Sequence, residues 1–471
     1  YIVDIIFIAM PTKNRVFMRY EPSQELLIPP NLHDWLPKDH LVYFISEVID
    51  DLDLTPIQRY YDSELGGAPP YHPTMMTKII LYGYAMGIPS SRRMVRAIDE
   101  DVAFRVLAAG NRPDFRTISD FRKNHIDRLK GLFGQVVMLC RKAGLVKLGT
   151  VALDGTKVKA NASLAKNRSY ENLCEEEREL EKEILDGLME GVNVDEEEDK
   201  LYGRDRRGDE LPEGFRTKKE RLDRIRRAKE EIERKKAEEV RAQEEKIEDR
   251  RRREKESGER LRGRKPNEPD HSVDEDAMAN TTDPESRIMK TSKGYTQGYN
   301  CQAVVDAGHQ IIVAETVTQE ENDYHQLVPM LDKVRCVNGE YPDRCIADAG
   351  YCTEDALATA PPEVGLYLAT MKDRNQRMAL QNAPSVRGRI PASATPMERM
   401  KRKMKTKKGQ AIYRKRGPTV EPVFGQIKDG RRLDRFLLRG IVKVGGEWSM
   451  FCTTHNILKL WRSGRGRREP A

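Results

Sequence analysis

The sequence lacks long apolar runs and has few cysteines. No stretch of its 471 residues approaches the 18 consecutive apolar residues expected of a membrane-spanning helix. The most apolar segment, residues 2–10, contains Asp4 and has neither a basic leader nor a small-residue cleavage site, so it is not a signal peptide. The seven cysteines form no CxxC motif and no Cys/His cluster with zinc-ligand spacing. A membrane protein, a disulfide framework and a zinc finger are therefore excluded, and scattered thiols favour a reducing cytoplasm.

Charged residues are abundant, nearly balanced overall and strongly segregated. Lys and Arg number 83 against 76 Asp and Glu, which gives a net charge of only +7. Residues 171–199 carry 14 acids and two bases, whereas residues 387–435 carry 16 bases and four acids. Residues 216–256 carry 18 bases and 13 acids, many at i,i+4 spacing, with a narrow apolar stripe. The stripe consists of Leu222, Ile225, Ala228, Ile232, Ala237 and Val240. We expect residues 171–279 to be a charged helical or partly disordered insertion.

Residues 30–148 have the pattern of short helices joined by turns. Apolar residues recur at helical spacing over residues 72–84, and Ser119 is placed to cap a longer helix that extends to Cys140. Arg92 and Arg93 are among the bases between these helices, an arrangement that suits helix-turn-helix binding to DNA. The alternative is an ordinary helical domain with a solvated basic face.

The rest of the chain predicts an α/β fold with a mixed sheet of five short strands, including one hairpin. The expected strands cover residues 150–153, 299–306, 310–317, 344–347 and 366–370. Asp154 and Asp348 each follow a strand and precede a glycine by one or two positions, so we expect both at the carboxyl ends of strands, where α/β sheets bind ligands. Glu421 lies in the basic segment at the expected start of the last helix. Asp283 and Asp323 are auxiliary acids or turn caps.

Three carboxylates from separate elements of a locally basic chain suit metal-dependent phosphoryl transfer. Mg²⁺ prefers carboxylate oxygens and keeps several waters, so two or three acids suffice to hold it. Two such ions stabilise the attacking and leaving oxygens of an in-line displacement, and the surrounding Lys and Arg would hold a phosphate backbone. Each acid alone is equally well explained as a turn cap or a helix-dipole partner.

Five separated blocks of the chain resemble the bacterial insertion-sequence transposases of the DDE type. The match is closest to the group named insertion sequence eleven-eighty-two, within the four/five-like assemblage, with its InsH-type N-terminal domain. The resemblance covers about residues 20–461, and its blocks are residues 72–122, 153–157, 282–287, 346–351 and 420–428.

This resemblance implies a ribonuclease-H-like catalytic core and a two-ion Mg²⁺ site in which Mn²⁺ can substitute. Asp154, Asp348 and Glu421 would be the metal ligands. Tyr413, Arg416, Glu421 and Lys428 resemble the family's Tyr, Arg, Glu, Lys signature, although the interval from Arg416 to Glu421 is one residue longer than the common form. Seven positions separate Glu421 from Lys428, which predicts that both face the same side of a helix. DNA contacts are expected from Lys428, Arg416, Tyr413, Arg92, Arg93 and Lys157.

The resemblance further implies a protein that binds terminal inverted repeats, cleaves the transposon end to leave a 3′-OH, and joins that end to target DNA. It would act as a homodimer or larger assembly on double-stranded DNA, at the bacterial nucleoid in the cytoplasm. The expected organisation is a poorly ordered leader (1–29), a helical DNA-binding domain (30–148), a catalytic domain (149–170 and 280–461), the insertion (171–279) and a basic tail (462–471).

Three other interpretations stay open at this point. A decayed transposase would bind DNA ends without cutting, and a hydrolytic nuclease could use the same fold. A charged coiled-coil scaffold would explain only residues 171–256, which lack sustained heptads.

Overall fold

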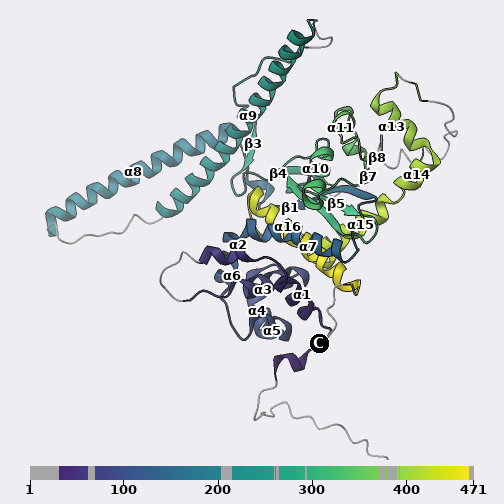
Figure 1. Cartoon of the computed structure of the whole chain (residues 1–471). Helices are drawn as coiled ribbons and strands as arrows, with labels where there is room; N and C mark the ends of the chain where they lie inside the picture. Colours follow the sequence, from purple (N-terminus) through teal and green to yellow (C-terminus); the bar gives the residue numbers. More distant parts are fainter. Residues whose placement is uncertain are drawn as a thin grey trace, which may run out of the picture.

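A mixed sheet with helices around it forms the body of the molecule, and a long helical hairpin projects from it (Figure 1). This computed structural model describes residues 31–61, 69–202, 215–258, 260, 265–291, 294–371, 378, 390–391 and 393–465, without the side chains of residues 33, 187–202 and 215–216. The expected leader and the end of the basic tail lie outside the described residues. No described helix has the length and apolarity of a membrane span.

The N-terminal part is helical. Its elements are η1 (Leu32–Trp35), α1 (Leu41–Asp50), α2 (Thr55–Gln58), η2 (Arg59–Tyr61), α3 (Pro73–Ala85), α4 (Ser91–Glu100), α5 (Val102–Ala108), α6 (Phe115–Asn124) and α7 (Ile126–Lys142). The prediction that Ser119 caps one long helix was wrong. Asp114 caps α6 by accepting from the Arg116 N–H, and a break at His125 separates α6 from α7. An acceptor earlier in the chain therefore begins the helix one turn sooner.

The sheet has six strands and mixed direction. They are β1 (Val151–Lys159), β4 (Arg287–Thr291), β5 (Gly294–Asp306), β6 (Ile312–Thr318), β7 (Arg344–Ala347) and β8 (Gly365–Leu368). β1 pairs antiparallel with β5 and parallel with β7, and β8 pairs parallel with β7. β4 and β6 both pair antiparallel with the long β5. The mixed sheet and its hairpin were predicted, but β4 is an additional strand.

The strand that carries Asp154 is longer than the sequence suggested. β1 has nine residues and Asp154 is the fourth, so the prediction of a strand end and sharp turn at Gly155 was wrong. Polar residues such as Thr156 and Lys157 stay in the strand because they pair with β5 over the whole length of β1. Asp348, in contrast, directly follows β7 as predicted.

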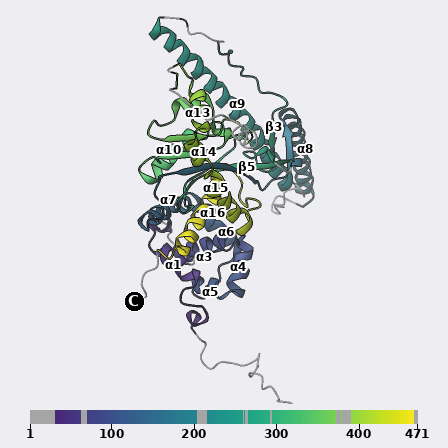
Figure 2. The ribbon, with the colours of Figure 1, turned by 90° about the vertical axis from the view of Figure 1, so that its right-hand side faces the viewer.

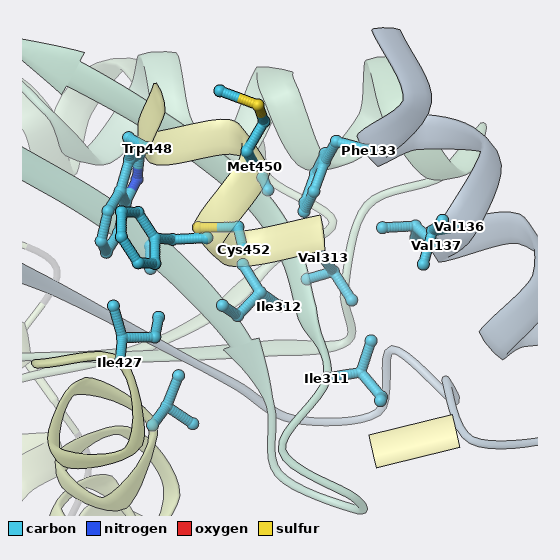
Figure 3. Packing of buried hydrophobic residues seen from close by; sticks show 14 of the residues in the cluster. Phe133, Val136, Val137, Ile311, Ile312, Val313, Ile427, Trp448, Met450 and Cys452 are labelled. Carbon is cyan, nitrogen blue, oxygen red and sulfur yellow. The ribbon is translucent and has the colours of Figure 1, made fainter. Parts of the chain in front are cut away.

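Helix α16 (Ile441–Arg462) joins the N-terminal helices to the sheet. Of its 22 residues, 15 are buried. It packs against α3 and α7 on one side and β6 on the other. Figure 3 shows side chains of α7, β6 and α16 converging with Ile427 in one cluster. One contiguous apolar core therefore spans the N-terminal helices and the sheet.

The charged insertion folds as an antiparallel pair of long helices. Its elements are η3 (Leu164–Lys166), β2 (Asn167–Ser169), α8 (Tyr170–Tyr202), α9 (Phe215–Ser257) and β3 (Met278–Asn280), with β2 and β3 paired. Apolar residues of both helices and of β3 form a small second core, made of Leu173, Leu180, Leu222, Ile225, Ala228, Ile232 and Ala279. Acids of α8 pair with bases of α9, as in Arg226 with Glu177 at 3.0 Å. Figure 2 shows α9 rising beyond the body of the molecule.

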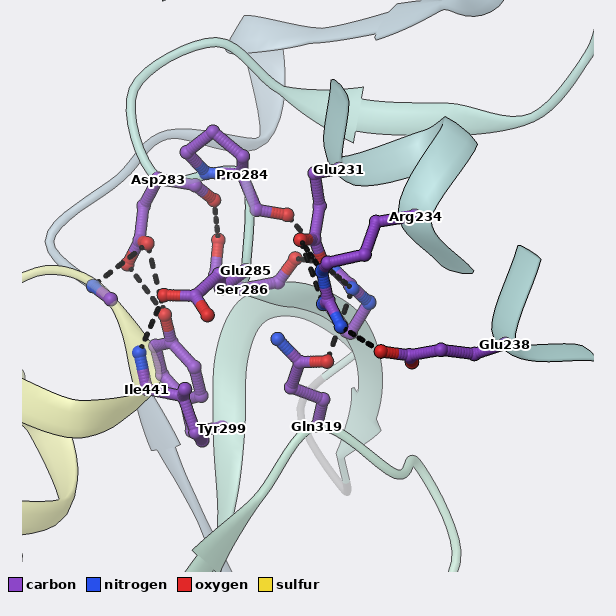
Figure 4. Close-up of polar contacts among 12 residues, drawn as sticks. Glu231, Arg234, Glu238, Asp283, Pro284, Glu285, Ser286, Tyr299, Gln319 and Ile441 are labelled. Carbon is purple, nitrogen blue, oxygen red and sulfur yellow. Dashed lines mark hydrogen bonds and ion pairs between the residues drawn. The ribbon is translucent and has the colours of Figure 1, made fainter. Parts of the chain in front are cut away.

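Residues 282–287 tie the insertion, the sheet and α16 together (Figure 4). Asp283 is buried and accepts hydrogen bonds from the Tyr299 hydroxyl (2.9 Å) and the Gly440 N–H (3.1 Å). Glu285 accepts from the Ile441 N–H at 2.8 Å, so both acids satisfy donors at the start of α16. Arg287 forms a buried ion pair with Glu231 of α9 at 2.6 Å. Asp283 is thus a structural capping residue.

The remaining elements all follow β6 in the chain. They are α10 (Leu327–Asn338), η4 (Ala349–Tyr351), α11 (Glu354–Thr359), α13 (Pro396–Lys405), α14 (Lys407–Tyr413), α15 (Arg416–Gly425) and the π-helical segment η5 (Gln426–Gly430). All seven cysteines are free thiols.

Candidate active site

Asp154 lies on β1, and Asp348 lies directly after the neighbouring parallel strand β7, at the same level of the sheet. Val151 pairs with Cys345 and Ala152 with Ile346, and the same offset places Asp154 beside Asp348. Neighbouring strands are about 4.8 Å apart, so two acids from distant parts of the sequence meet. The sequence predicted this pair, and the register of β1 with β7 brings it together.

The Asp154 carboxylate is half-buried and faces Arg416. Its Oδ2 accepts from Arg416 Nη1 at 2.7 Å, and its Oδ1 accepts from the Gly155 N–H at 3.0 Å. Burial raises the pKa of Asp154 to about 6; Arg416 opposes this rise and Asp348 adds to it. The mutual repulsion of the two aspartates favours a cation or a proton between them.

Asp348 begins the short helix that follows β7. Its Oδ1 accepts from the Gly350 N–H at 2.9 Å, which fixes the carboxylate at the mouth of the turn. Tyr351 in the same turn is fully buried, and its hydroxyl donates to Gln302 Oε1. Burial and the nearby aspartates raise the pKa of Tyr351 well above its usual value, so it stays a neutral donor. The hydrogen bond from Tyr351 to Gln302 therefore holds the turn that carries Asp348 against the sheet.

A third aspartate supports this anchor from the loop after β6. Asp323 Oδ1 accepts from Asn300 Nδ2 at 2.8 Å and from Gln302 Nε2 at 2.6 Å. Gln302 pairs with Gly155 across the strands, so its side chain faces the side of the sheet opposite to that of Asp154. Asp323 thus stabilises the turn of Asp348 indirectly: it fixes the Gln302 side chain, which in turn accepts the hydrogen bond from Tyr351.

Glycine at position 155 makes room for this network. A Cβ atom there would lie 2.6 Å from Gln302 Nε2 and 2.8 Å from Asp323 Oδ1. Sequence reasoning treated Gly155 as a turn residue and Asp323 as an optional acid. The sequence signal for this network was the pair of polar residues Asn300 and Gln302 at alternate positions of the expected strand, because buried amides need specific partners.

Helix α15 presents Arg416, rather than Glu421, to Asp154. Glu421 is exposed and packs back against Gly417, whose Cβ position lies 3.2 Å from Glu421 Oε1. Five residues of α-helix correspond to a rotation of about 140°, so Arg416 and Glu421 face different directions. The assignment of Glu421 as a metal ligand stays a prediction.

The backbone around Glu421 departs from a regular helix. Pro422 has no N–H to bond the carbonyl of Pro418, and Gln310 Nε2 donates to that carbonyl instead, at 2.9 Å. The π-helical η5 follows directly, and such segments occur often at functional sites. Glu421 and Lys428 are therefore not two regular α-helical turns apart, which changes the geometry that the sequence predicted.

The predicted DNA-contacting residues fall into two groups. Lys428 is half-buried and its Nζ donates to the Lys157 carbonyl at 2.9 Å, while Lys157 Nζ reaches the Lys290 carbonyl at 2.9 Å. Burial lowers the pKa of Lys428. Tyr413 ends α14 and is partly buried against the main apolar core.

Arg92 and Arg93 are exposed on α4, among the N-terminal helices and away from β1 and β7 (Figures 1 and 2). The Arg92 guanidinium lies over the Phe115 ring, 4.3 Å from its centre. These two arginines could contact only a DNA segment distant from the aspartate pair.

Within the described ranges, no group of three or more His, Cys, Asp or Glu residues is arranged to hold a metal ion. Asp154 and Asp348 nevertheless supply the hard oxygen donors that a divalent cation prefers, and such an ion needs few protein ligands. The donor set of these two aspartates therefore fits a divalent cation.

Comparison with known proteins finds two transposase families that match separate parts of the chain. Residues 30–124 match the family described as Transposase domain (DUF772), and residues 384–461 match the family described as Transposase DDE domain. The second match contains Arg416, Glu421 and Lys428. No curated protein and no solved structure matches the chain significantly. The mixed α/β fold is consistent with a DDE transposase.

The two matches support, more particularly, a transposase family of insertion sequences. This family implies DNA binding, and its DDE domain typically uses a divalent metal.

Proposed function

We propose that this protein is a metal-dependent DNA transposase of the insertion-sequence group eleven-eighty-two. It binds the terminal inverted repeats of its element, cleaves the DNA at these ends and joins the 3′ ends to target DNA. The observation that carries the proposal is the pair of Asp154 on β1 and Asp348 directly after β7, at the same level of two adjacent parallel strands. The strand order β6-β5-β1-β7-β8, with β5 antiparallel, supports a ribonuclease-H-like core.

Asp154 and Asp348 would hold the divalent cation, Mg²⁺ or Mn²⁺. Glu421 would become its third protein ligand once helix α15 has rotated about its own axis. When bound, the cation supplies stabilisation of negative charge on the reacting phosphate oxygens. Arg416 balances the Asp154 charge before that and is then released to a DNA phosphate. The Asp323 network holds the turn of Asp348 in place throughout.

Basic helices beside the site would hold the DNA backbone. α13 and α14 contain seven exposed or half-buried bases, and Arg414 and Lys415 continue this surface to Arg416. Tyr413, Lys428 and Lys157 border the same region, whereas Arg92 and Arg93 would bind a more distant part of the transposon end. Because two transposon ends must be paired, we expect a homodimer or larger assembly. It would act at the bacterial nucleoid.

A cleavage and strand-transfer assay with Mg²⁺ and the element's own ends tests this function. Asp154→Asn, Asp348→Asn and Glu421→Gln should each lower the rate by about 100-fold or more, because each removes a ligand worth several kcal/mol in the transition state. The control is Asp343→Asn, an exposed acid directly before β7.

Full activity of any of the three variants would remove that residue from the ligand set. Cleavage without joining would identify a hydrolytic nuclease, and end binding without cleavage would identify a decayed transposase.

A further inference from the structure

A small cavity lined by basic side chains lies where α3, η5 and α16 meet, outside the aspartate site. Its volume is about 130 Å³. The lining residues are Ala85, Gln426, Gly430, Arg431, His455, Leu458, Lys459 and Arg462. Three of them are Lys or Arg, and none is an acid.

Arg431 is the most deeply buried of these cations, with 4% of its surface exposed. Its guanidinium donates to the carbonyls of Gln426 (3.2 Å) and Phe451 (3.0 Å) and to Nδ1 of His455 (2.8 Å). All three acceptors are neutral. A buried cation is normally paired with an anion, so this environment leaves its charge uncompensated.

His455 fixes the direction of Arg431. Its Nε2 lies 2.9 Å from the Gln310 carbonyl and donates to it, which leaves Nδ1 as the acceptor for Arg431. Burial and the Arg431 charge lower the pKa of His455 well below its usual value. The imidazole therefore orients the guanidinium and adds no charge of its own.

Lys459 and Arg462 extend the positive charge along one face of α16. They are three residues apart, so both side chains point to the same side of the helix. Lys459 is half-buried and donates to Gln310 Oε1 at 2.7 Å. Burial lowers the pKa of Arg431 to about 10, and burial with the charges of Arg462 and Arg431 lowers that of Lys459.

The neighbouring surface continues the basic character toward the aspartate site. A second cavity of about 500 Å³ is lined by His309, Arg414 and Lys415, among others. Gln310 lines this second cavity and accepts from Lys459, so it joins the two. A strand of DNA could follow this surface from Arg462 to Arg416.

We propose that the cavity of Arg431, Lys459 and Arg462 binds a phosphate group. The cavity of about 130 Å³ has room for one tetrahedral anion, and its three cations without an acid favour an anionic ligand. The phosphate belongs either to the DNA backbone or to free phosphate in solution. The DNA source rests on the proposed transposase function, whereas anion binding itself does not.

The first experiment measures melting of the full-length protein in EDTA, in sodium phosphate against sodium chloride of equal ionic strength. Phosphate should raise the melting temperature of the wild type, because a ligand that binds only the folded state stabilises it. The double variant Lys459→Gln/Arg462→Gln should lose this rise. Lys443→Gln, at an exposed position of the same helix, should keep it. An equal rise in all three proteins, or none in the wild type, would overturn the proposal.

The second experiment identifies the source of the phosphate. Binding of a transposon-end duplex is followed by fluorescence anisotropy in EDTA at several salt concentrations. If a DNA phosphate occupies the cavity, the slope of log K against log salt should be less steep in the double variant, by about 0.9 for each DNA phosphate that the variant no longer neutralises. An unchanged slope, together with the phosphate effect, would assign the site to free phosphate.

Both experiments omit divalent metal and need no catalysis. An inactive aspartate site would therefore leave their result intact, and an empty cavity would leave the cleavage assay intact.

Discussion

His125 makes the stability of the helical part depend on pH. Its ring is fully buried between α6 and α7, 4.8 Å from the Tyr60 ring and 4.6 Å from the Phe121 ring, and Nε2 lies 3.0 Å from the Tyr61 hydroxyl. Burial, with the nearby Arg128 charge, lowers its pKa from 6.5 to about 4. The folded protein therefore holds this histidine neutral under conditions where the unfolded chain protonates it.

The sign and size of the effect follow from proton linkage. A lowered pKa contributes stability that is complete above pH 6.5 and is lost as the pH falls toward 4, because the unfolded chain binds the proton first. The full loss is about 3.4 kcal/mol, and about 2 kcal/mol of it occurs by pH 5. Buried His455 acts in the same direction, so the wild type alone does not isolate His125.

The assay is urea denaturation of the wild type and His125→Gln at pH 7.5 and pH 5.0. The amide can still bond Tyr61 but does not titrate. The stability advantage of the wild type over the variant should shrink by about 2 kcal/mol between the two pH values. His325→Gln, at an exposed position, controls for loss of a histidine. A difference between wild type and variant that is the same at both pH values would refute the reasoning.

Three further predictions concern packing and the insertion. Gly155→Ala should cost about 1–3 kcal/mol in denaturation and lower cleavage activity, since its Cβ would overlap Gln302; Gly134→Ala, with open space around the Cβ, should be neutral or stabilising. Glu231→Ala should lower the free energy of unfolding by about 3–5 kcal/mol and increase amide hydrogen exchange in α9, because it leaves the buried Arg287 without its carboxylate partner. Adding Arg287→Met should recover much of this lost stability. A double variant that recovers none of it would contradict a charge effect. Trp448→Ala should cost about 3–5 kcal/mol in denaturation, since the indole is fully buried, and a cost below about 1 kcal/mol would count against its place in the core.

The local pattern of apolar and turn residues was enough to predict most helices and strands and the position of Asp348. The hairpin of β5 and β6, the strand β7 and Asp348 directly after it all follow from apolar runs bounded by turn residues. The position of Asp154 within its strand did not follow, because polar residues continue β1 only where β5 supplies partners. Ser119 looked like a cap because it precedes apolar residues, yet Asp114 begins the helix.

The details of α15 show why the rest could not be predicted. Helical spacing alone places Glu421 and Lys428 on one face, but Pro422 and the π-helical η5 change the phase between them. Which side of α15 meets Asp154 depends on its packing against β1, and there Arg416 makes the contact. A sequence specifies the faces of a helix but not the rotation in which it docks.

The sequence by itself determined the segregation of charge, the element types and the two aspartates that precede glycines. It also carried the blocks that resemble DDE transposases. Tertiary structure alone decided that β1 and β7 align these aspartates, that Asp323 and Gln302 support them from the opposite face, and that Arg431, Lys459 and Arg462 surround one cavity. The physical reason is that periodicity and composition act over a few residues, whereas register and helix docking are set by burial between segments far apart in the chain.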